Sequence, residues 1–251
     1  MEFIQKELIV NCGEKKIFGL LHMPKEHDGS LPLVIMSHGI YASHQMTGKS
    51  ADVLAVKGIA CYCFDFYGGS YSRKSGGTTL EFSVLTEVEE LSAVIDTVAN
   101  LDFVDREKVF LYGESLGGAV TILTAAKRPQ GIAGLILMYP AIHAAEVFRT
   151  QYPDGNFPEV LENALGAPGL NLSRKFFEDV VSVDFESSMA GYKNPVFITH
   201  GTDDKLVPVS YGEKAANTFP NATIKIIPGA PHGYPLDEGL ATEVLEFIKT
   251  N

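Results

Sequence analysis

Short apolar segments alternate with longer amphipathic segments along most of the chain. Runs such as Leu33–Met36 and Leu135–Tyr139 are apolar throughout, which is typical of strands covered on both faces of a sheet. Eight segments predict strands: Glu7–Val10, Ile17–Met23, Leu33–Ser37, Ile59–Phe64, Val109–Tyr112, Gly134–Met138, Val196–His200 and Thr223–Ile227. The first two alternate more regularly between apolar and polar residues, which favours an antiparallel start of the sheet.

Helical patterns lie between these strands. One of them opens with Thr86 and Glu89, which have the spacing of a capping box. The apolar face of this helix is formed by Val88, Leu91, Ile95 and Val98. Further helices are expected at Ser115–Lys127, Val209–Thr218 and Asp237–Lys249. Because this alternation is typical of strands joined by crossover helices, we predict a single α/β domain over residues 1–251. Its mostly parallel, eight-stranded sheet should carry helices on both faces.

One interval interrupts the alternation. About 50 residues separate Ala141 from Lys193, whereas a simple loop between a helix and a strand has roughly two to six. Two short helical patterns lie inside it, at Pro158–Leu165 and Ser173–Val181. The insertion is either a crossover whose aromatic residues pack onto the sheet or a lid over a site. Its position relative to the motifs described below favours the lid.

The charge of the chain limits its partners. It has 31 acidic and 20 basic side chains, a formal net charge of −11. No Lys/Arg cluster is longer than two residues, and the acidity disfavours anionic membranes, so we expect neither a nucleic-acid nor a membrane partner. The longest apolar runs are far shorter than the roughly 20 residues that cross a bilayer. With no signal-peptide pattern at the start, we expect a cytoplasmic protein.

The three cysteines do not form a paired disulfide framework. Cys61 and Cys63 lie two positions apart in an expected strand, so they should face the same side of it, and Cys12 stands alone. A zinc site needs more ligands than this pair supplies, and the sequence contains no other Cys/His cluster or H-E-x-x-H motif. We therefore expect buried thiols, no metal and no cofactor.

The segment Gly113-Glu-Ser115-Leu-Gly117 has the pattern of a nucleophile elbow. Such a turn between a strand and a helix exposes the serine, and its two glycines permit the close backbone approach that the turn requires. The expected strand ends at Tyr112 and an expected helix follows, so the context agrees with the motif. The alternative is a plain glycine-rich turn. We predict that Ser115 is a nucleophile.

A serine nucleophile needs a base and an acid that orients the base. In this architecture they follow in the order Ser, Asp or Glu, His. His232 lies between the last expected strand and the last expected helix, from where it can reach the strand ends, and we predict it as the base. The acid should follow Val196–His200, where Asp203 and Asp204 are both candidates. Spacing alone does not decide between them.

The oxyanion formed during attack needs two N–H donors, and the loss of one costs about 3 kcal/mol of transition-state stabilisation. We predict the backbone N–H groups of Leu116, directly after the nucleophile, and of Ile40, in the loop after Leu33–Ser37. His38 and His200 each precede a glycine at a strand end. Packing or a hydrogen bond to the backbone is the commoner role there.

Four segments together resemble the α/β-hydrolase superfamily over the whole chain. They are Ser37-His-Gly-Ile40, Gly113-Glu-Ser-Leu-Gly117, His200-Gly-Thr-Asp-Asp204-Lys-Leu-Val-Pro208 and Pro231-His-Gly233. The resemblance implies an α/β-hydrolase fold, and the family pattern H-G-x-x-D-x-x-V-P places the acid at Asp204. The segment Phe64–Ser70, followed by Thr86-Glu87 and a helix, resembles the cinnamoyl and feruloyl esterases of intestinal and rumen bacteria. The insertion at 141–193 is similar to the compact lid of that group.

This resemblance implies a serine carboxylic-ester hydrolase that releases hydroxycinnamic acids from a small-molecule ester, without a cofactor. A monoacylglycerol lipase and a short-acyl carboxylesterase share the same frame and are the alternatives. An inactive ligand-binding module would usually lack the serine or the histidine, and both are present. Four side chains either bind a phenolic hydroxyl or pack within the fold: Tyr139, Glu146, Tyr152 and Tyr192. The oligomeric state is open, with a homodimer among the alternatives.

Overall fold

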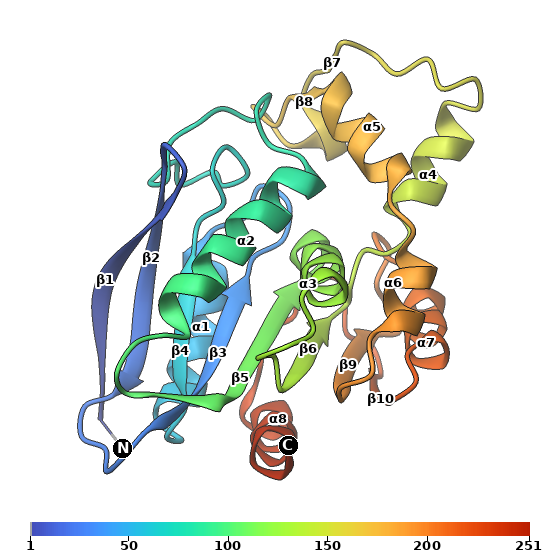
Figure 1. Ribbon diagram of the computed structural model, residues 1–251. Coiled ribbons are helices and arrows are strands. Elements are labelled where there is room, and N and C mark those ends of the chain that lie inside the picture. The colour runs from blue at the N-terminus through green and yellow to red at the C-terminus, as the bar shows by residue number, and fades with distance from the viewer. Residues whose placement is uncertain (1) are drawn as a thin grey trace.

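The computed structural model describes residues 2–251, and an eight-stranded sheet forms its centre (Figure 1). The strands are β1 (Phe3–Cys12), β2 (Lys15–Pro24), β3 (Leu31–Ser37), β4 (Ala60–Phe64), β5 (Val104–Glu114), β6 (Gly134–Met138), β9 (Val196–Gly201) and β10 (Ala222–Ile227). They are ordered β1-β2-β4-β3-β5-β6-β9-β10 across the sheet. β2 is antiparallel to both β1 and β4, and all other neighbours are parallel. The eight predicted strands and the antiparallel start are confirmed.

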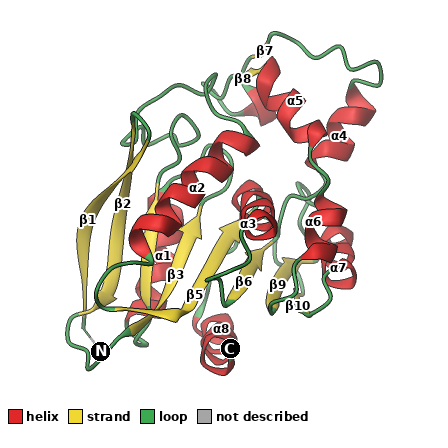
Figure 2. Cartoon of the chain, in the orientation of Figure 1, coloured by secondary structure: helices red, strands yellow, loops and turns green. Residues whose placement is uncertain are grey.

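Helices cover both faces of this sheet (Figure 2). On one face lie α1 (His44–Ala55) and α8 (Glu238–Thr250). On the other lie α2 (Val84–Val98), α3 (Leu116–Lys127), α6 (Phe185–Gly191) and α7 (Val209–Thr218). Each face has its own apolar core, and the inner strands β3, β4, β6 and β9 between them are almost fully buried. The predicted sheet with helices on both faces is confirmed.

The start of α2 differs from the predicted capping box. The N-cap is Ser83, whose hydroxyl accepts a hydrogen bond from the N–H of Thr86 at 3.3 Å. The hydroxyl of Thr86 in turn accepts from the N–H of Ser83 at 2.8 Å. The prediction of Thr86 and Glu89 is therefore wrong. A threonine hydroxyl at the third helical position closes the box in the way that a glutamate carboxylate usually does.

Between β6 and β9 the chain leaves the sheet over residues 139–195. This segment contains α4 (Ala144–Gln151), β7 (Val160–Leu161), the 3-10 turn η1 (Ala164–Gly166), β8 (Leu172–Ser173), α5 (Arg174–Ser182) and α6. Figure 1 shows α4, β7, β8 and α5 beyond the carboxyl ends of the sheet strands. Phe177 is fully buried there and packs against the rings of Phe148, Tyr152 and Phe157. Several of the aromatic residues in the insertion therefore form its own small core.

The two helices predicted inside this insertion have different outcomes. The pattern at Ser173–Val181 is confirmed by α5. The helix predicted at Pro158–Leu165 is wrong, because β7 pairs with β8 there and Asn163 and Leu165 have left-handed backbone angles, with φ of 48° and 56°. The carboxamide of Asn163 accepts a hydrogen bond from the N–H of Gly169 at 3.0 Å, which stabilises a loop in place of a helix.

The thiols follow the sequence prediction. Cys61 and Cys63 are buried together in the core beneath α1, and no cysteine in residues 2–251 forms a disulfide. Burial raises the pKa of the Cys61 thiol far above its usual value, so it stays protonated. In the described part of the chain, no helix is both long and apolar enough to cross a bilayer.

Candidate active site

Ser115 occupies a sharp turn between β5 and α3. Its backbone angles, φ 51° and ψ −118°, lie in a region that L-residues rarely adopt. A Cβ atom on Gly113 would lie 2.5 Å from the carbonyl oxygen of Gly117, and one on Gly117 would lie 2.4 Å from that of His38. Both positions must therefore lack a side chain for the turn to form. The turn has the geometry expected of a nucleophile elbow.

Three side chains from distant segments meet at this turn. The Nε2 atom of His232 lies 3.0 Å from Oγ of Ser115, and its Nδ1 atom lies 2.7 Å from Oδ2 of Asp204. The other oxygen of Asp204 accepts the N–H groups of Leu206 and Val207 at 2.9 and 2.8 Å. Asp204 follows β9 and His232 follows β10, so the parallel order of these strands brings both loops to the end of the sheet where Ser115 lies.

The hydrogen bonds join Asp204, and not Asp203, to His232. Asp203 is exposed, and its Oδ1 atom lies 3.2 Å from the hydroxyl of Thr202. Asp204 is buried, and Nε2 of His200 lies 3.4 Å from its Oδ2 atom. The same Nε2 lies 2.8 Å from the carbonyl oxygen of Val207, to which it donates. Burial lowers the pKa of His200, so its ring stays neutral beside the carboxylate.

The two predicted oxyanion donors flank Ser115. Leu116 is the first residue of α3, so its N–H has no intrahelical acceptor. Within residues 2–251, the N–H of Ile40 also donates to no protein group. Both residues line a cavity that contains Ser115 in its wall. Both N–H groups therefore remain without a protein acceptor, and their residues line the same cavity as Ser115.

His38 fixes the loop that carries Ile40. Its Nε2 atom accepts a hydrogen bond from the N–H of Phe66 at 3.1 Å, and its Nδ1 atom donates to the carbonyl oxygen of Gly39 at 2.7 Å. Burial lowers the pKa of His38, which agrees with this neutral tautomer. The expectation that His38 and His200 bind backbone groups is confirmed.

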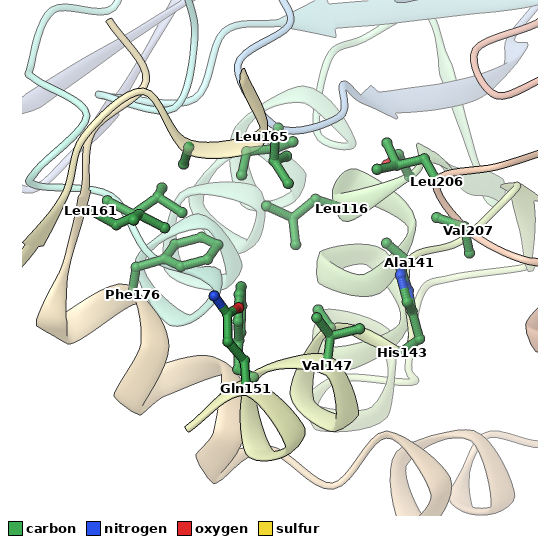
Figure 3. Close-up of a pocket in the computed structure, with 16 residues that line it drawn as sticks. Leu116, Ala141, His143, Val147, Gln151, Leu161, Leu165, Phe176, Leu206 and Val207 are labelled. Atoms are coloured by element: carbon green, nitrogen blue, oxygen red, sulfur yellow. The ribbon is translucent and has the colours of Figure 1, made fainter. Parts of the chain in front are cut away.

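Two cavities open beside Ser115. The first, which we call the α4–α5 cavity, has a volume of about 310 Å³ and lies among α3, α4, α5 and the loop after β9. Its walls are mostly apolar, and besides Ser115 the polar side chains in them are His143 and Gln151. Figure 3 shows the carboxamide of Gln151 directed into this cavity beside Phe176, across from Leu206. Gln151, which is an exposed residue, therefore adds a third polar side chain to a mostly apolar pocket.

The second cavity, which we call the His232 cavity, has a volume of about 250 Å³. His232, Gly39 and Met46 line it, together with parts of the insertion. The ring of Tyr139 also contributes to its wall and packs against the imidazole of His232, with 4.7 Å between the ring centroids. Ser115 belongs to the walls of both cavities. A bound molecule can therefore extend from the hydroxyl in two directions.

The model of the family described as "Serine aminopeptidase, S33" matches residues 30–167. The chain belongs to this family.

The structure of Est1E from Butyrivibrio proteoclasticus with bound ferulic acid is similar to this one, with a TM-score of 0.85 and 26% identity. The match covers 97% of this chain and 96% of the Est1E chain. An uncharacterised protein of Mycobacterium tuberculosis is 27% identical over 234 residues, 92% of this chain and 73% of that protein. Human monoglyceride lipase is 29% identical over 116 residues, 45% of this chain and 36% of the lipase.

These likenesses confirm the prediction of an α/β-hydrolase with serine esterase chemistry. The S33 family membership and the likeness to the Est1E esterase together identify the protein as a serine ester hydrolase. The ester itself does not follow from family membership, because the walls of the two cavities come largely from the insertion and from loops. No cluster of three or more His, Cys, Asp or Glu side chains within residues 2–251 has the arrangement of a metal site.

Some residues of this S33 site carry no motif in the sequence. Gln151, His143 and Phe176 line the α4–α5 cavity, and their placement depends on how the insertion folds. Of the four side chains left open above, Tyr139 lines the His232 cavity. Within the described chain, Glu146, Tyr152 and Tyr192 line neither cavity.

A buried carboxyl group lies directly before the nucleophile. Glu114 is 4% exposed, and the hydroxyl of Tyr112 donates to its Oε1 atom at 2.7 Å. Burial raises the pKa of Glu114 to about 7, because the charged carboxylate loses its solvation. The hydrogen bond from Tyr112 partly opposes this shift. The residue is therefore close to half-protonated at neutral pH.

Proposed function

We propose that this protein is a hydroxycinnamoyl esterase in which Ser115, His232 and Asp204 perform a two-step acyl transfer. His232 removes the proton of Ser115 as its oxygen attacks the ester carbonyl, and the same imidazole then protonates the leaving alcohol. Asp204 keeps Nδ1–H of His232 oriented and stabilises the imidazolium. Water then repeats the sequence against the acyl-enzyme and frees the acid.

The N–H groups of Ile40 and Leu116 supply the oxyanion hole in this proposal. Among residues 2–251 neither N–H has a protein acceptor, and both residues line the cavity that contains the Ser115 hydroxyl. Leu116 also begins α3, whose N-terminus favours negative charge. These donors are fixed before the reaction, so they require no reorganisation as charge develops on the carbonyl oxygen.

The α4–α5 cavity is the reason for assigning a hydroxycinnamic acid as the acid part of the substrate. Its volume of about 310 Å³ suits a small organic molecule, and its apolar walls suit an aromatic ring joined to a short unsaturated chain. The carboxamide of Gln151 offers a partner to a phenolic hydroxyl (Figure 3). The bound ferulic acid in the Est1E structure supports the same acid class.

In this proposal residues 141–193 form a lid on a single domain, 1–251. α4 and α5 provide Val147, Gln151 and Phe176 to the wall of the α4–α5 cavity. The lid thus shapes the pocket for the acid. Because of the likeness to monoglyceride lipase, the competing function is that of a lipase. A comparison of ester substrates distinguishes a lipase from a hydroxycinnamoyl esterase.

The test compares kcat/KM for methyl ferulate with that for methyl octanoate and for a monooctanoylglycerol. We expect ferulate to be preferred by tenfold or more, which corresponds to about 1.4 kcal/mol of transition-state binding. A preference for either octanoyl ester would contradict the proposed acid class and favour a lipase. Such a result would leave the acyl-transfer chemistry of Ser115 in place.

Gln151→Leu isolates the polar contact. In this variant the preference for methyl p-coumarate over methyl cinnamate, which differs only in lacking the phenolic hydroxyl, should fall by at least tenfold. Gln130→Leu makes the same chemical change at an exposed loop position and should keep the wild-type ratio. An unchanged ratio in Gln151→Leu would remove the argument for a phenolic acid.

A further inference from the structure

The two cavities at Ser115 differ in one catalytic respect. They share four wall residues, Ile40, Ser115, Leu165 and Leu206. His232 lines only the His232 cavity, whereas Leu116 lines only the α4–α5 cavity. The imidazole that moves the proton therefore lies in the wall of the His232 cavity. The insertion encloses the α4–α5 cavity, whose wall contains Leu116.

The position of His232 determines where the alcohol part of an ester must lie. The leaving oxygen takes its proton from Nε2 of His232, so it must come within hydrogen-bonding distance of that atom. The group attached to this oxygen then extends into the cavity that His232 lines. The acid part then occupies the α4–α5 cavity. This assignment of the two parts of the ester rests on the acyl-transfer chemistry of the proposed function.

The walls of the His232 cavity are suited to an apolar group. Met46, Ala167 and Leu170 line it in addition to the shared residues. The exposed fractions of Leu165 and Leu206 are 62% and 45%, so apolar side chains also surround the shared opening at Ser115. Such side chains offer apolar contact to an alkyl or aryl group and no hydrogen bond to a polyol.

Three polar side chains in these walls each make one hydrogen bond within the protein. The hydroxyl of Tyr139 donates to the carbonyl oxygen of Tyr234 at 3.4 Å, and that of Tyr41 donates to the carbonyl oxygen of Pro168 at 3.4 Å. The carboxyl group of Glu114 accepts from Tyr112. A sugar or glycerol moiety would therefore bury several hydroxyls with few partners, whereas an alkyl or aryl alcohol would bury none beyond its reacting oxygen.

We propose that the His232 cavity is a site for an apolar alcohol, which is the leaving group in hydrolysis and an acceptor in acyl transfer. In transfer, the alcohol oxygen attacks the carbonyl carbon of the acyl-Ser115 ester while His232 takes the alcohol proton. The bond between the carbonyl carbon and Oγ of Ser115 breaks, and His232 returns the proton to Oγ. The products are a new ester and free Ser115, with water replaced by the alcohol as nucleophile.

A substrate series tests the site without any variant. Within ferulate esters, and separately within butyrate esters, the alcohol is n-butanol or glycerol. We expect kcat/KM for the n-butyl ester to exceed that for the glyceryl ester by about tenfold in both series. Equal values, or a preference for glyceryl esters, would overturn the inference. If the butyrates show this preference but ferulates are not hydrolysed, the proposed acid class fails and the alcohol site stands.

Two matched variants then assign the preference to one cavity. Ala167 lines only the His232 cavity and Ala144 lines only the α4–α5 cavity, and both are half-buried. Ala167→Phe should lower kcat/KM for n-butyl ferulate by about tenfold or more and change that for methyl ferulate by less than about threefold. Ala144→Phe should lower both by the same factor. The reverse pattern, or equal losses for both esters in Ala167→Phe, would overturn the assignment.

Acyl transfer gives an independent readout. Wild-type protein is supplied with methyl ferulate and equal concentrations of 1-butanol and glycerol, and the ester products are measured by chromatography. We expect n-butyl ferulate to exceed glyceryl ferulate by about tenfold, and Ala167→Phe to reduce this ratio. Methyl butyrate replaces methyl ferulate if the ferulate is not cleaved. The absence of any butyl ester, with hydrolysis intact, would contradict an alcohol site next to His232.

Discussion

The backbone N–H of Phe66 donates a hydrogen bond to Nε2 of His38, across 28 positions of the sequence and at 3.1 Å. This bond requires an unprotonated Nε2, so the ring proton is on Nδ1, where it binds the carbonyl oxygen of Gly39. The neutral imidazole therefore ties the segment after β4 to the loop that carries Ile40. The position of one proposed oxyanion donor therefore depends on a histidine outside the proposed triad.

Replacement of His38 should therefore affect the reaction more than substrate binding. In His38→Ala the Phe66 N–H loses its acceptor, and the free energy of unfolding should fall by about 1–3 kcal/mol. Because the Ile40 N–H loses its alignment, kcat should fall by about tenfold or more with a smaller change in KM. His27→Ala is the control, since His27 is exposed and its Nδ1 also lies close to a glycine carbonyl, that of Gly29 at 2.9 Å. A fall in KM and kcat alike in both variants would argue against the positioning role.

The two neighbouring aspartates provide a second matched pair. Asp204→Asn removes the carboxylate that binds His232 and should reduce kcat/KM by about 10²–10⁴. Asp203→Asn changes an exposed side chain one position away and should stay within about twofold of the wild type. Steady-state kinetics on methyl ferulate or methyl butyrate measures both. The opposite ranking would show that Asp203 is the acid.

Much of the fold could be predicted because its signals are local. The strands are apolar runs, and the elbow around Ser115 is a short motif with a fixed geometric requirement. The sequence pattern does not predict α1, because several of its buried residues are polar or small. Among them are His44, Thr47, Gly48 and Ser50. His44 instead binds the carboxylate of Asp65, a contact between distant segments that no periodicity reveals.

The residues of the candidate site also differ in whether the local sequence predicts them. Ser115, His232 and the two proposed oxyanion donors follow from motif and order along the chain. The choice of Asp204 came only from a family pattern, because two adjacent aspartates have the same local signal. The pocket residues Gln151 and Phe176 could not be predicted, because their positions depend on the fold of the insertion, where a left-handed turn replaces an expected helix.

The tight turn around Ser115 predicts that one added methyl group at Gly117 strongly lowers the free energy of unfolding. In Gly117→Ala the new Cβ atom would lie 2.4 Å from the carbonyl oxygen of His38 and 2.5 Å from that of Ser37. Neither backbone group can move without disturbing β3, so we expect a loss of about 3 kcal/mol or more in unfolding free energy. Gly191→Ala is the control, because its Cβ would meet nothing within 4 Å. Chemical denaturation of both variants measures the difference, and similar stabilities would show that the turn is not tightly packed.

Glu114 predicts a pH-dependent stability. Its pKa is about 7 in the folded protein and near the ordinary glutamate value of 4.5 when unfolded, so the folded state holds the proton more tightly. Stability is therefore lost as the pH rises from about 4.5 through 7, by about 3 kcal/mol in total. Glu114→Gln keeps an acceptor for Tyr112 and should not show this loss. Denaturation of both proteins at pH 5, 6, 7 and 8 tests this, and parallel curves would contradict the buried carboxyl.

The central claim is that Ser115 carries the acyl group, and labelling with a fluorophosphonate tests it most directly. The probe reacts with an activated serine, and mass spectrometry of the intact protein and its peptides locates the adduct. We predict one adduct per chain, on Ser115, that is absent from Ser115→Ala, together with a fall in kcat of about 10⁴–10⁶ in that variant. An adduct on another residue, or more than a tenth of the wild-type rate in Ser115→Ala, would contradict the account.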